Sequence, residues 1–172
     1  PIVEPEVLMD GNHDIDQCFE VTESTLREVF YQLAQHNVSL EGCLLKPNMV
    51  LSGGSAVNRA GAEEVAEKTL ACFKRVVPAA IPGIVFLSGG QSDDEATLNL
   101  DAINKCAAKI GAPWQLSFSF GRGLQQATLK AWIGKDDNSQ KAKQAFYHRA
   151  KLTSVARQGK YTSEMENATS RS

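Results

Sequence analysis

The sequence has no hydrophobic run close to the roughly 18 residues that cross a membrane, and it shows no signal peptide. Its formal net charge is only -2, which favours neither nucleic acid nor an anionic membrane as a partner. Its four cysteines have no CxxC spacing, and its three histidines do not cluster. These absences predict reduced thiols, no metal site and a cytoplasmic location.

The composition is that of a soluble domain, with 42% hydrophobic and 22% charged residues. A chain of 172 residues can bury a substantial core in one domain. Apolar segments alternate with amphipathic segments along the chain, which predicts a parallel sheet with crossover helices. The expected strands cover residues 2–6, 38–46, 83–87 and 114–120.

Local signals place several of the helices. One helix is expected to begin at residue 22 or 23 and to end near residue 35, and a second is expected over residues 62–77. Ser92 and Glu95 have the spacing of a capping box, so a third helix is expected to begin there. The residues expected to share the buried face of the second helix are Val65, Thr69, Cys72 and Phe73.

The stretch Leu-Leu-Lys-Pro-Asn-Met, residues 44–49, carries a residue that is unusual in an apolar strand. Pro47 favours an extended conformation in the residue before it, so Lys46 is expected to end the second strand. Burial of an ammonium group is costly, and desolvation favours the neutral amine that an imine-forming nucleophile needs. From this stretch alone, a strand-end lysine that reaches solvent is an equally good interpretation.

Glu4 and Glu6 flank Pro5 near the end of the first expected strand. Because side chains alternate along a strand, both carboxylates are expected to face the same side of the sheet. Two neighbouring carboxylates beside a lysine can differ in proton affinity, so that one acts as an acid and the other as a base. Taken alone, the two glutamates are also compatible with ordinary surface acids.

Glycine-containing loops follow the third and fourth expected strands. The loop at residues 88–90 reads Ser-Gly-Gly and leads into a capped helix, where backbone N–H groups can approach a phosphate. The fourth strand ends on Ser-Phe-Gly-Arg, residues 119–122, and an arginine pairs well with a phosphate dianion. One such loop could serve the turn alone, but two in succession favour a phosphate site. The candidate phosphate-binding residues are Ser88, Gly89, Gly90, Ser119, Gly121 and Arg122.

The candidate residues all lie at the carboxyl ends of expected strands. An open doubly wound sheet usually binds its ligand near one switch point, whereas an α/β barrel gathers its active site at all its strand ends. We therefore expect residues 1–157 to form half of a barrel that ends in a helix. Residues 158–172, rich in Gly, Ser, Thr and Asn, are expected to form a flexible tail. Because the sequence opens directly on a strand, it is expected to be a fragment that lacks its N-terminal part.

Six segments, spread over nearly the whole sequence, resemble class I fructose-bisphosphate aldolase and occur in that family's order. They are PIVEPE at 1–6, LLKPNMV at 44–50, FLSGGQS at 86–92, LDAINKC at 100–106, SFSFGR at 117–122 and QGKY at 158–161. The resemblance implies the C-terminal half of a (β/α)8 TIM barrel, holding strands five to eight. It also implies reversible cleavage of fructose 1,6-bisphosphate to dihydroxyacetone phosphate and glyceraldehyde 3-phosphate, in glycolysis and gluconeogenesis.

The resemblance assigns a role to each candidate residue. Lys46 matches the lysine that forms a Schiff base with the substrate, so neither a metal nor another cofactor is implied. Glu4 matches the acid/base glutamate, and Glu6 matches a glutamate that supports imine formation. The loops at 88–90 and 119–122 match the binding site for the C1 phosphate of a phosphosugar. The full-length parent is expected to be a homotetramer.

The sequence also departs from the family in several places. The aspartate and lysines of the first four strands are absent, so the chain alone is expected to be incomplete for turnover. Phe120 stands where many relatives carry a tyrosine, and the last tyrosine is Tyr161, whereas animal members end in one. A half barrel leaves two strand edges open, so a non-catalytic interaction or scaffold module is the alternative. Another imine-forming phosphosugar aldolase would keep Lys46, but the match outside the catalytic residues disfavours it.

Overall fold

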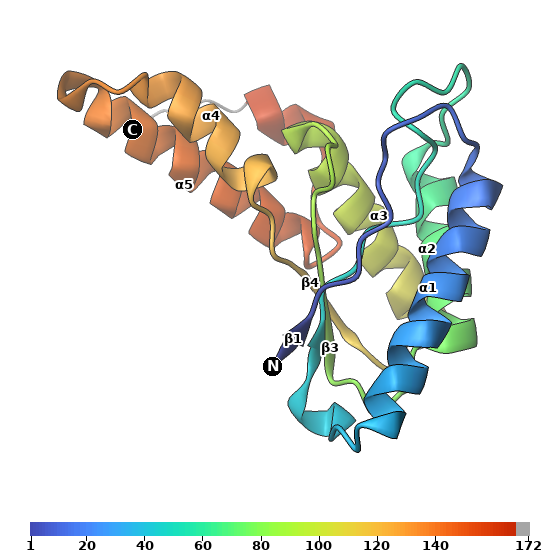
Figure 1. Ribbon diagram of the computed structural model, residues 1–172. Helices are drawn as coiled ribbons and strands as arrows, with labels where there is room; N and C mark the ends of the chain where they lie inside the picture. The colour runs from blue at the N-terminus through green and yellow to red at the C-terminus, as the bar shows by residue number, and fades with distance from the viewer. Residues whose placement is uncertain (168–172) are drawn as a thin grey trace.

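The structure is a computed structural model and describes residues 1–167. A sheet of four strands lies at its centre (Figure 1). The strands are β1 (Ile2–Val3), β2 (Leu44–Leu45), β3 (Gly83–Phe86) and β4 (Gln115–Phe118). They stand in sequence order, and every neighbouring pair is parallel. The parallel sheet expected from the alternating pattern is thus confirmed.

Each strand is followed by helix. The helices are α1 (Ile15–Gln35), α2 (Ala62–Val76), α3 (Asp93–Ile110), α4 (Arg122–Trp132) and α5 (Ser139–Ala156). Short 3-10 turns in the described residues are η1 (Leu40–Gly42), η2 (Asp136–Asn138) and η3 (Ser163–Asn167). In Figure 1, α1, α2 and α3 stand side by side along the sheet, whereas α4 and α5 form a pair. Contacts between α5 and α3 join this pair to the other helices.

Aromatic side chains join α2 to the sheet. The rings of Phe73 in α2 and Phe86 in β3 are fully buried and stack with their centroids 5.8 Å apart. Trp114, just before β4, meets Phe73 edge-on at 6.5 Å, and its indole N–H donates to the carbonyl oxygen of Pro78. The four residues expected on the inner face of α2 are all buried, which confirms that prediction. This packing fixes the end of β3, where the loop at residues 88–90 begins.

Several boundaries expected from the sequence are wrong. The first expected strand, residues 2–6, is reduced to β1, because Pro5 has no N–H for a further hydrogen bond of the sheet. The first helix begins well before residue 22, because the carboxylate of Asp14 caps it by accepting the N–H of Gln17 at 2.8 Å. The expected second strand is reduced to β2, because the chain first turns through η1. There the N–H of Cys43 donates to the carbonyl oxygen of Leu40 at 3.0 Å, and an N–H used in a turn cannot serve a sheet.

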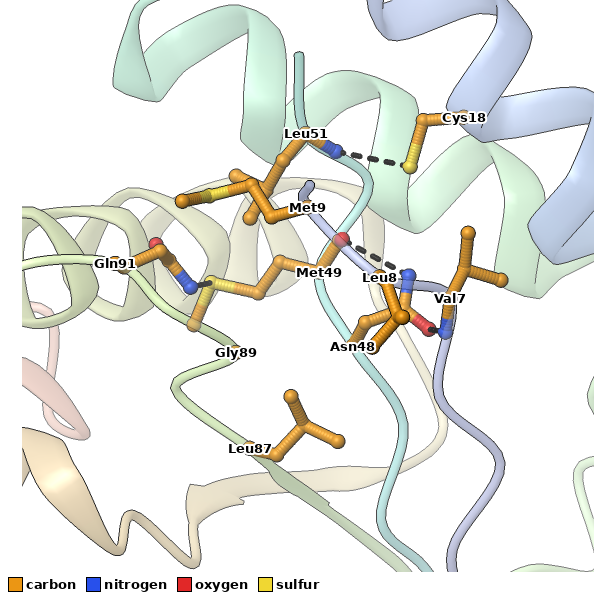
Figure 2. Close-up of a pocket in the computed structure, with 10 residues that line it drawn as sticks. All are labelled: Val7, Leu8, Met9, Cys18, Asn48, Met49, Leu51, Leu87, Gly89 and Gln91. Atoms are coloured by element: carbon orange, nitrogen blue, oxygen red, sulfur yellow. Dashed lines mark hydrogen bonds between the residues drawn. The ribbon is translucent and has the colours of Figure 1, made fainter. Parts of the chain in front are cut away.

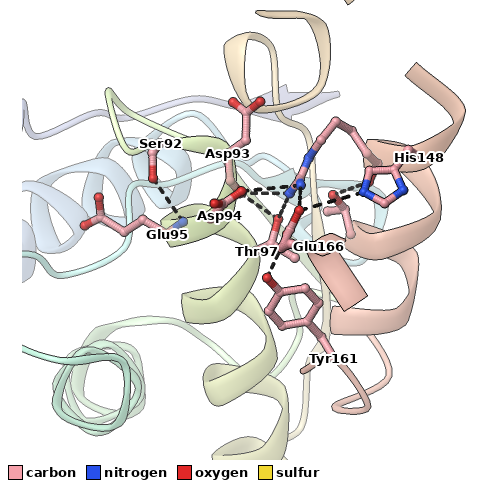
Figure 3. A network of polar contacts seen from close by, with 10 residues as sticks. Ser92, Asp93, Asp94, Glu95, Thr97, His148, Tyr161 and Glu166 are labelled. Atoms are coloured by element: carbon pink, nitrogen blue, oxygen red, sulfur yellow. Dashed lines mark hydrogen bonds and ion pairs between the residues drawn. The ribbon is translucent and has the colours of Figure 1, made fainter. Parts of the chain in front are cut away.

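The segment after α5 contacts α3 through a polar network (Figure 3). Tyr161 is buried, and its hydroxyl donates to the carboxylate of Glu166 at 2.7 Å. Arg149 of α5 is also buried; it pairs with Glu166 and donates to the hydroxyl of Thr97 in α3 at 2.7 Å. These contacts involve the first part of the expected tail, while residues 168–172 lie outside the described residues. The division of the chain into a domain and a flexible tail stays a prediction.

Candidate active site

Backbone hydrogen bonds align the strand ends at one edge of the sheet. Beyond each pair of neighbouring strands, one more N–H donates to the carbonyl oxygen of the adjacent segment. The three bonds are Lys46 to Val3 at 2.8 Å, Leu87 to Pro47 at 3.1 Å and Ser119 to Phe86 at 2.8 Å. Residues on different loops are therefore brought to the same level of the sheet, which is where α/β barrels hold their active sites.

Lys46 and Glu4 meet at this edge. Lys46 directly follows β2 and Glu4 directly follows β1, so each lies at the expected strand end. The Nζ atom of Lys46 donates to the Oε2 atom of Glu4 at 2.8 Å. The lysine side chain is 24% exposed and the glutamate side chain is 55% exposed. Of the two interpretations that the sequence leaves open, this geometry is nearer to the strand-end lysine that reaches solvent, and the role of Lys46 as a nucleophile stays a prediction.

Glu6 lies apart from this ion pair. It is exposed, and a Cβ atom placed on Gly89 would lie 3.9 Å from its Oε1 atom. Glu6 therefore lies close to the loop after β3, while Glu4 contacts Lys46. Strand alternation predicts one shared face for the two carboxylates, and both are exposed while Pro5 and Val7 are partly buried, although β1 itself ends at Val3. The two carboxylates nevertheless have different neighbours.

The first glycine loop, residues 88–90, has a backbone conformation that glycine adopts readily. Its two glycines have φ values of +55° and +87°. The backbone N–H and the side-chain Nε2 of Gln91 both donate to the carbonyl oxygen of Ser88, at 3.0 and 2.9 Å. The hydroxyl of Ser92 accepts the N–H of Glu95 at 3.2 Å, which confirms the Ser92 half of the predicted cap, while the carboxylate of Glu95 pairs with Arg59. The N-terminus of α3 thus directly follows a glycine turn that is held by two hydrogen bonds from Gln91.

The second glycine loop, residues 119–122, lies beside the first. A Cβ atom placed on Gly123 would lie 3.2 Å from the Cβ atom of Ser88, so the start of α4 touches the first loop. Gly121 precedes α4 without a side-chain cap, so no side chain at that position accepts from the first N–H groups of this helix. Arg122 is exposed at the same place. Two helix N-termini and a guanidinium group together suit a phosphate.

A small void lies beside the first glycine loop, and Gly89 is among the residues that line it (Figure 2). It measures about 10 Å³, and its lining includes the side chains of Met9, Met49 and Leu87. One water molecule needs roughly this much space, so the void is too small for a sugar phosphate. The candidate site is therefore the open edge of the sheet rather than this void.

Asn48 is a site residue that the sequence patterns do not single out. It is buried, and its side-chain oxygen accepts the N–H of Val7 at 2.9 Å. Its amide nitrogen donates to the hydroxyl of Thr22 at 3.1 Å. The signal present in the sequence is an asparagine two residues after Lys46, which needs hydrogen-bond partners if it is buried. Those partners are 41 and 26 residues away, beyond the reach of a local pattern.

The described residues contain few other groups of functional interest. Within residues 1–167, no three His, Cys, Asp or Glu side chains are grouped so that they could hold a metal ion. Among the described helices, none is long and apolar enough to cross a membrane. The four cysteines are free, and three of them are buried. The groups at the strand ends are an amine, carboxylates, a guanidinium and backbone N–H groups.

These observations define an α/β protein in which a lysine, two glutamates and two glycine loops lie at the carboxyl ends of parallel strands. A family model described as glycolytic, fructose-bisphosphate aldolase class-I, matches residues 1–172. The chain belongs to this family, as the resemblance of its motifs implies.

Individual relatives agree with this assignment. The chain is 52% identical to cytosolic fructose-bisphosphate aldolase 4 of Arabidopsis thaliana, a match over 96% of the chain and 42% of the relative. It is 55% identical to the cytoplasmic isozyme of Spinacia oleracea and 50% identical to aldolase C of Rattus norvegicus, each over 94% of the chain and 44% of the relative. The chain spans less than half the length of these relatives.

A solved structure supports the fold. It is a ternary complex of fructose-bisphosphate aldolase from Plasmodium falciparum with TRAP and a small-molecule inhibitor. The TM-score is 0.89 and the sequence identity is 47%, over 94% of this chain and 46% of that chain. At this identity and TM-score, the α/β fold with its parallel sheet matches that of an aldolase.

Proposed function

We propose that the protein containing this chain is a class I fructose-bisphosphate aldolase. It would cleave fructose 1,6-bisphosphate reversibly to dihydroxyacetone phosphate and glyceraldehyde 3-phosphate, in glycolysis and gluconeogenesis. The observation that carries the proposal is the 2.8 Å contact between the Nζ atom of Lys46 and the Oε2 atom of Glu4 at neighbouring strand ends. Family membership supports it, and the resemblance of the motifs assigns the reactive lysine and the acid/base glutamate to these two positions.

The chain would supply strands five to eight of a (β/α)8 barrel. Four parallel strands in sequence order, and coverage of less than half of each relative, support this interpretation. The remaining strands would continue the sheet from the edges of β1 and β4, and would add the acid and basic groups that this chain lacks. The isolated chain is then incomplete for turnover.

The chemistry begins at Lys46. Its amine attacks the C2 carbonyl of the sugar, and loss of water from the resulting carbinolamine gives an iminium ion. Glu4 is placed to take a proton from the ammonium group, which frees the amine, and to exchange protons with the substrate. Glu6 supports the loss of water during imine formation. When the C3–C4 bond breaks, the proton of the C4 hydroxyl passes to Glu4, and the electron pair of the bond moves into the iminium, so the carbanion is stabilised as an enamine. Protonation of the enamine at C3 and hydrolysis of the iminium then release dihydroxyacetone phosphate and regenerate Lys46.

The glycine loops would bind the C1 phosphate. Backbone N–H groups of the first and second glycine loops, together with the N-termini of α3 and α4, offer donors and positive potential to an anion. Arg122 adds a charged donor. The residues proposed to bind the phosphate are Ser88, Gly89, Gly90, Ser119, Gly121 and Arg122. This anchoring would hold the C2 carbonyl within reach of Lys46.

The full-length protein is proposed to work as a cytoplasmic homotetramer without a metal or another cofactor. Relatives named cytosolic or cytoplasmic support the location. Iminium formation supplies the electron sink that a metal would otherwise provide, which supports independence from metals. The partner is a small phosphosugar rather than nucleic acid or membrane.

Borohydride trapping with dihydroxyacetone phosphate, followed by peptide mass mapping, tests the function. The full-length protein should carry the reduced adduct on Lys46, and the variant Lys46→Arg, which keeps the charge but cannot form the imine, should carry none. The isolated chain should label weakly or not at all. An unlabelled full-length protein would refute the Schiff-base mechanism and leave the scaffold interpretation. A labelled protein that does not cleave fructose 1,6-bisphosphate would indicate another phosphosugar aldolase.

A further inference from the structure

Asn48 uses its side-chain oxygen and both side-chain N–H donors in hydrogen bonds next to the candidate site. Its Oδ1 atom accepts the N–H of Val7 at 2.9 Å. Its Nδ2 atom donates to the hydroxyl of Thr22 and to the carbonyl oxygen of Met49, both at 3.1 Å. The residue is only 5% exposed, so these bonds are shielded from water. Figure 2 shows Asn48 and Val7 joined by one of these bonds.

The bond to Val7 begins where backbone pairing between β1 and β2 stops. The N–H of Lys46 donates to the carbonyl oxygen of Val3 at 2.8 Å. Pro5 and Pro47 come next in the two segments, and neither has an N–H to add a further backbone bond. The side chain of Asn48 therefore replaces the missing backbone hydrogen bond. It connects the two segments again at Val7.

Glu4 and Glu6 lie between these two attachment points. On one side, Val3 is bonded to the backbone of Lys46, and on the other side, Val7 is bonded to Asn48. A strand of only two residues, such as β1, has little pairing of its own to hold the residues that follow it. The segment at residues 4–6 consequently depends on both attachments for its position.

We propose that Asn48 is a positioning residue for the aldol chemistry, because it fixes the Glu4–Glu6 segment relative to Lys46. This inference rests on the function proposed for Lys46. Loss of the bond to Val7 would free one end of the segment and let the Glu4 carboxylate leave its place beside the amine. A misplacement of about 1 Å can slow a reaction by about 100-fold.

A matched pair of variants in the full-length protein tests the inference. Asn48→Ala removes the bond to Val7, whereas Thr22→Val removes the α1 partner of the same amide and leaves the bond to Val7 intact. Both changes disturb the same buried network, so both should lower the melting temperature. Asn48→Ser is the substitute if the alanine variant does not fold, since its shorter side chain keeps a hydroxyl but reaches less far.

The readout is the rate of trappable imine formation on Lys46 at saturating dihydroxyacetone phosphate. Asn48→Ala should slow it by about 10- to 100-fold, with a changed pH profile, whereas Thr22→Val should leave it within about twofold. Hydrogen exchange of residues 4–7 should rise in the alanine variant alone. Equal rates in the two variants would overturn the inference while leaving the proposed function intact. A wild-type protein without label on Lys46 would overturn both.

Discussion

Gly89→Ala separates two roles that the first glycine loop can have, the turn into α3 and the binding of phosphate. Gly89 has a φ of +55°, in the left-handed region, and a Cβ atom there would lie 2.8 Å from the Cδ1 atom of Leu87 and 3.9 Å from Glu6. Gly111, at the end of α3, has a similar φ of +63° but nothing within 4 Å of its added Cβ atom. Gly111→Ala is therefore a control for the backbone cost alone.

The expected cost follows from these geometries. An L-residue in the left-handed region costs about 1–2 kcal/mol, so Gly111→Ala should lower the free energy of unfolding by that amount. Gly89→Ala should cost about 1 kcal/mol more, because the side chain of Leu87 must leave its rotamer. If the loop shifts enough to lose one charge-assisted hydrogen bond, worth about 1.5–3 kcal/mol, phosphate affinity falls by about 10- to 100-fold.

Two measurements on the full-length protein check this prediction. Urea denaturation gives the stability of each variant, and inhibition by inorganic phosphate gives the affinity of the site. Gly89→Ala should lose affinity and Gly111→Ala should keep it, although both lose stability. A Gly89→Ala protein that binds phosphate as well as the wild type would refute the phosphate role and leave the glycine as part of a turn.

Two further substitutions and one labelling experiment probe the packing of the helices. Hydrogen bonds from Arg27 and then Arg75 hold the pKa of Glu23 below its usual range. The ionised Glu23 therefore stabilises the fold at pH values above its unfolded-state pKa, and this stabilisation is lost as the pH falls through the lower folded-state pKa. Glu23→Gln should therefore lower the melting temperature near neutral pH but not in strong acid, which melts over a pH series can measure. Burial raises the pKa of the Cys72 thiol to about 12, so it should resist maleimide in the folded protein and react after unfolding, as peptide mapping can show. Arg149→Met should lower the free energy of unfolding by about 3 kcal/mol in urea melts, because it leaves a half-buried carboxylate without its cation.

The sequence predicts best where the deciding contacts are local. The cap that Ser92 provides for Glu95 is a contact across three residues, and the structure contains it. The continuous apolar run at residues 83–87 gives the strand β3, which ends at Phe86. The start of α1 is harder, because an aspartate-rich stretch can form either a turn or a cap. Asp14 caps the helix there, and the pattern alone does not separate these two outcomes.

In the candidate site, too, local features can be predicted from the sequence and long-range contacts cannot. Pro47 is enough to place Lys46 at a strand end, since proline restricts the residue before it. The environment of Lys46 could not be predicted, because burial depends on segments far away in the chain and on the pairing with Glu4, 42 residues distant. The role of Asn48 could not be predicted from the sequence for the same reason, since its hydrogen-bond partner Val7 lies 41 residues away. A local pattern can name a reactive residue but not the neighbours that hold it.

The site in this chain combines an internally fixed geometry with an exposed reactive group. Backbone hydrogen bonds beyond each strand pair fix the level of Lys46 and of both glycine loops, and all of these bonds lie within the chain. The side chain of Lys46 is nevertheless 24% exposed, so water still reaches the group that is proposed to act as a free amine. In the proposed barrel, the first four strands would then mainly shield Lys46 from water and add further acid and basic groups. Phosphate binding depends on the geometry held within the chain, whereas imine formation depends on shielding of Lys46 from water by the missing strands. We therefore expect the isolated chain to keep more of its phosphate binding than of its imine formation.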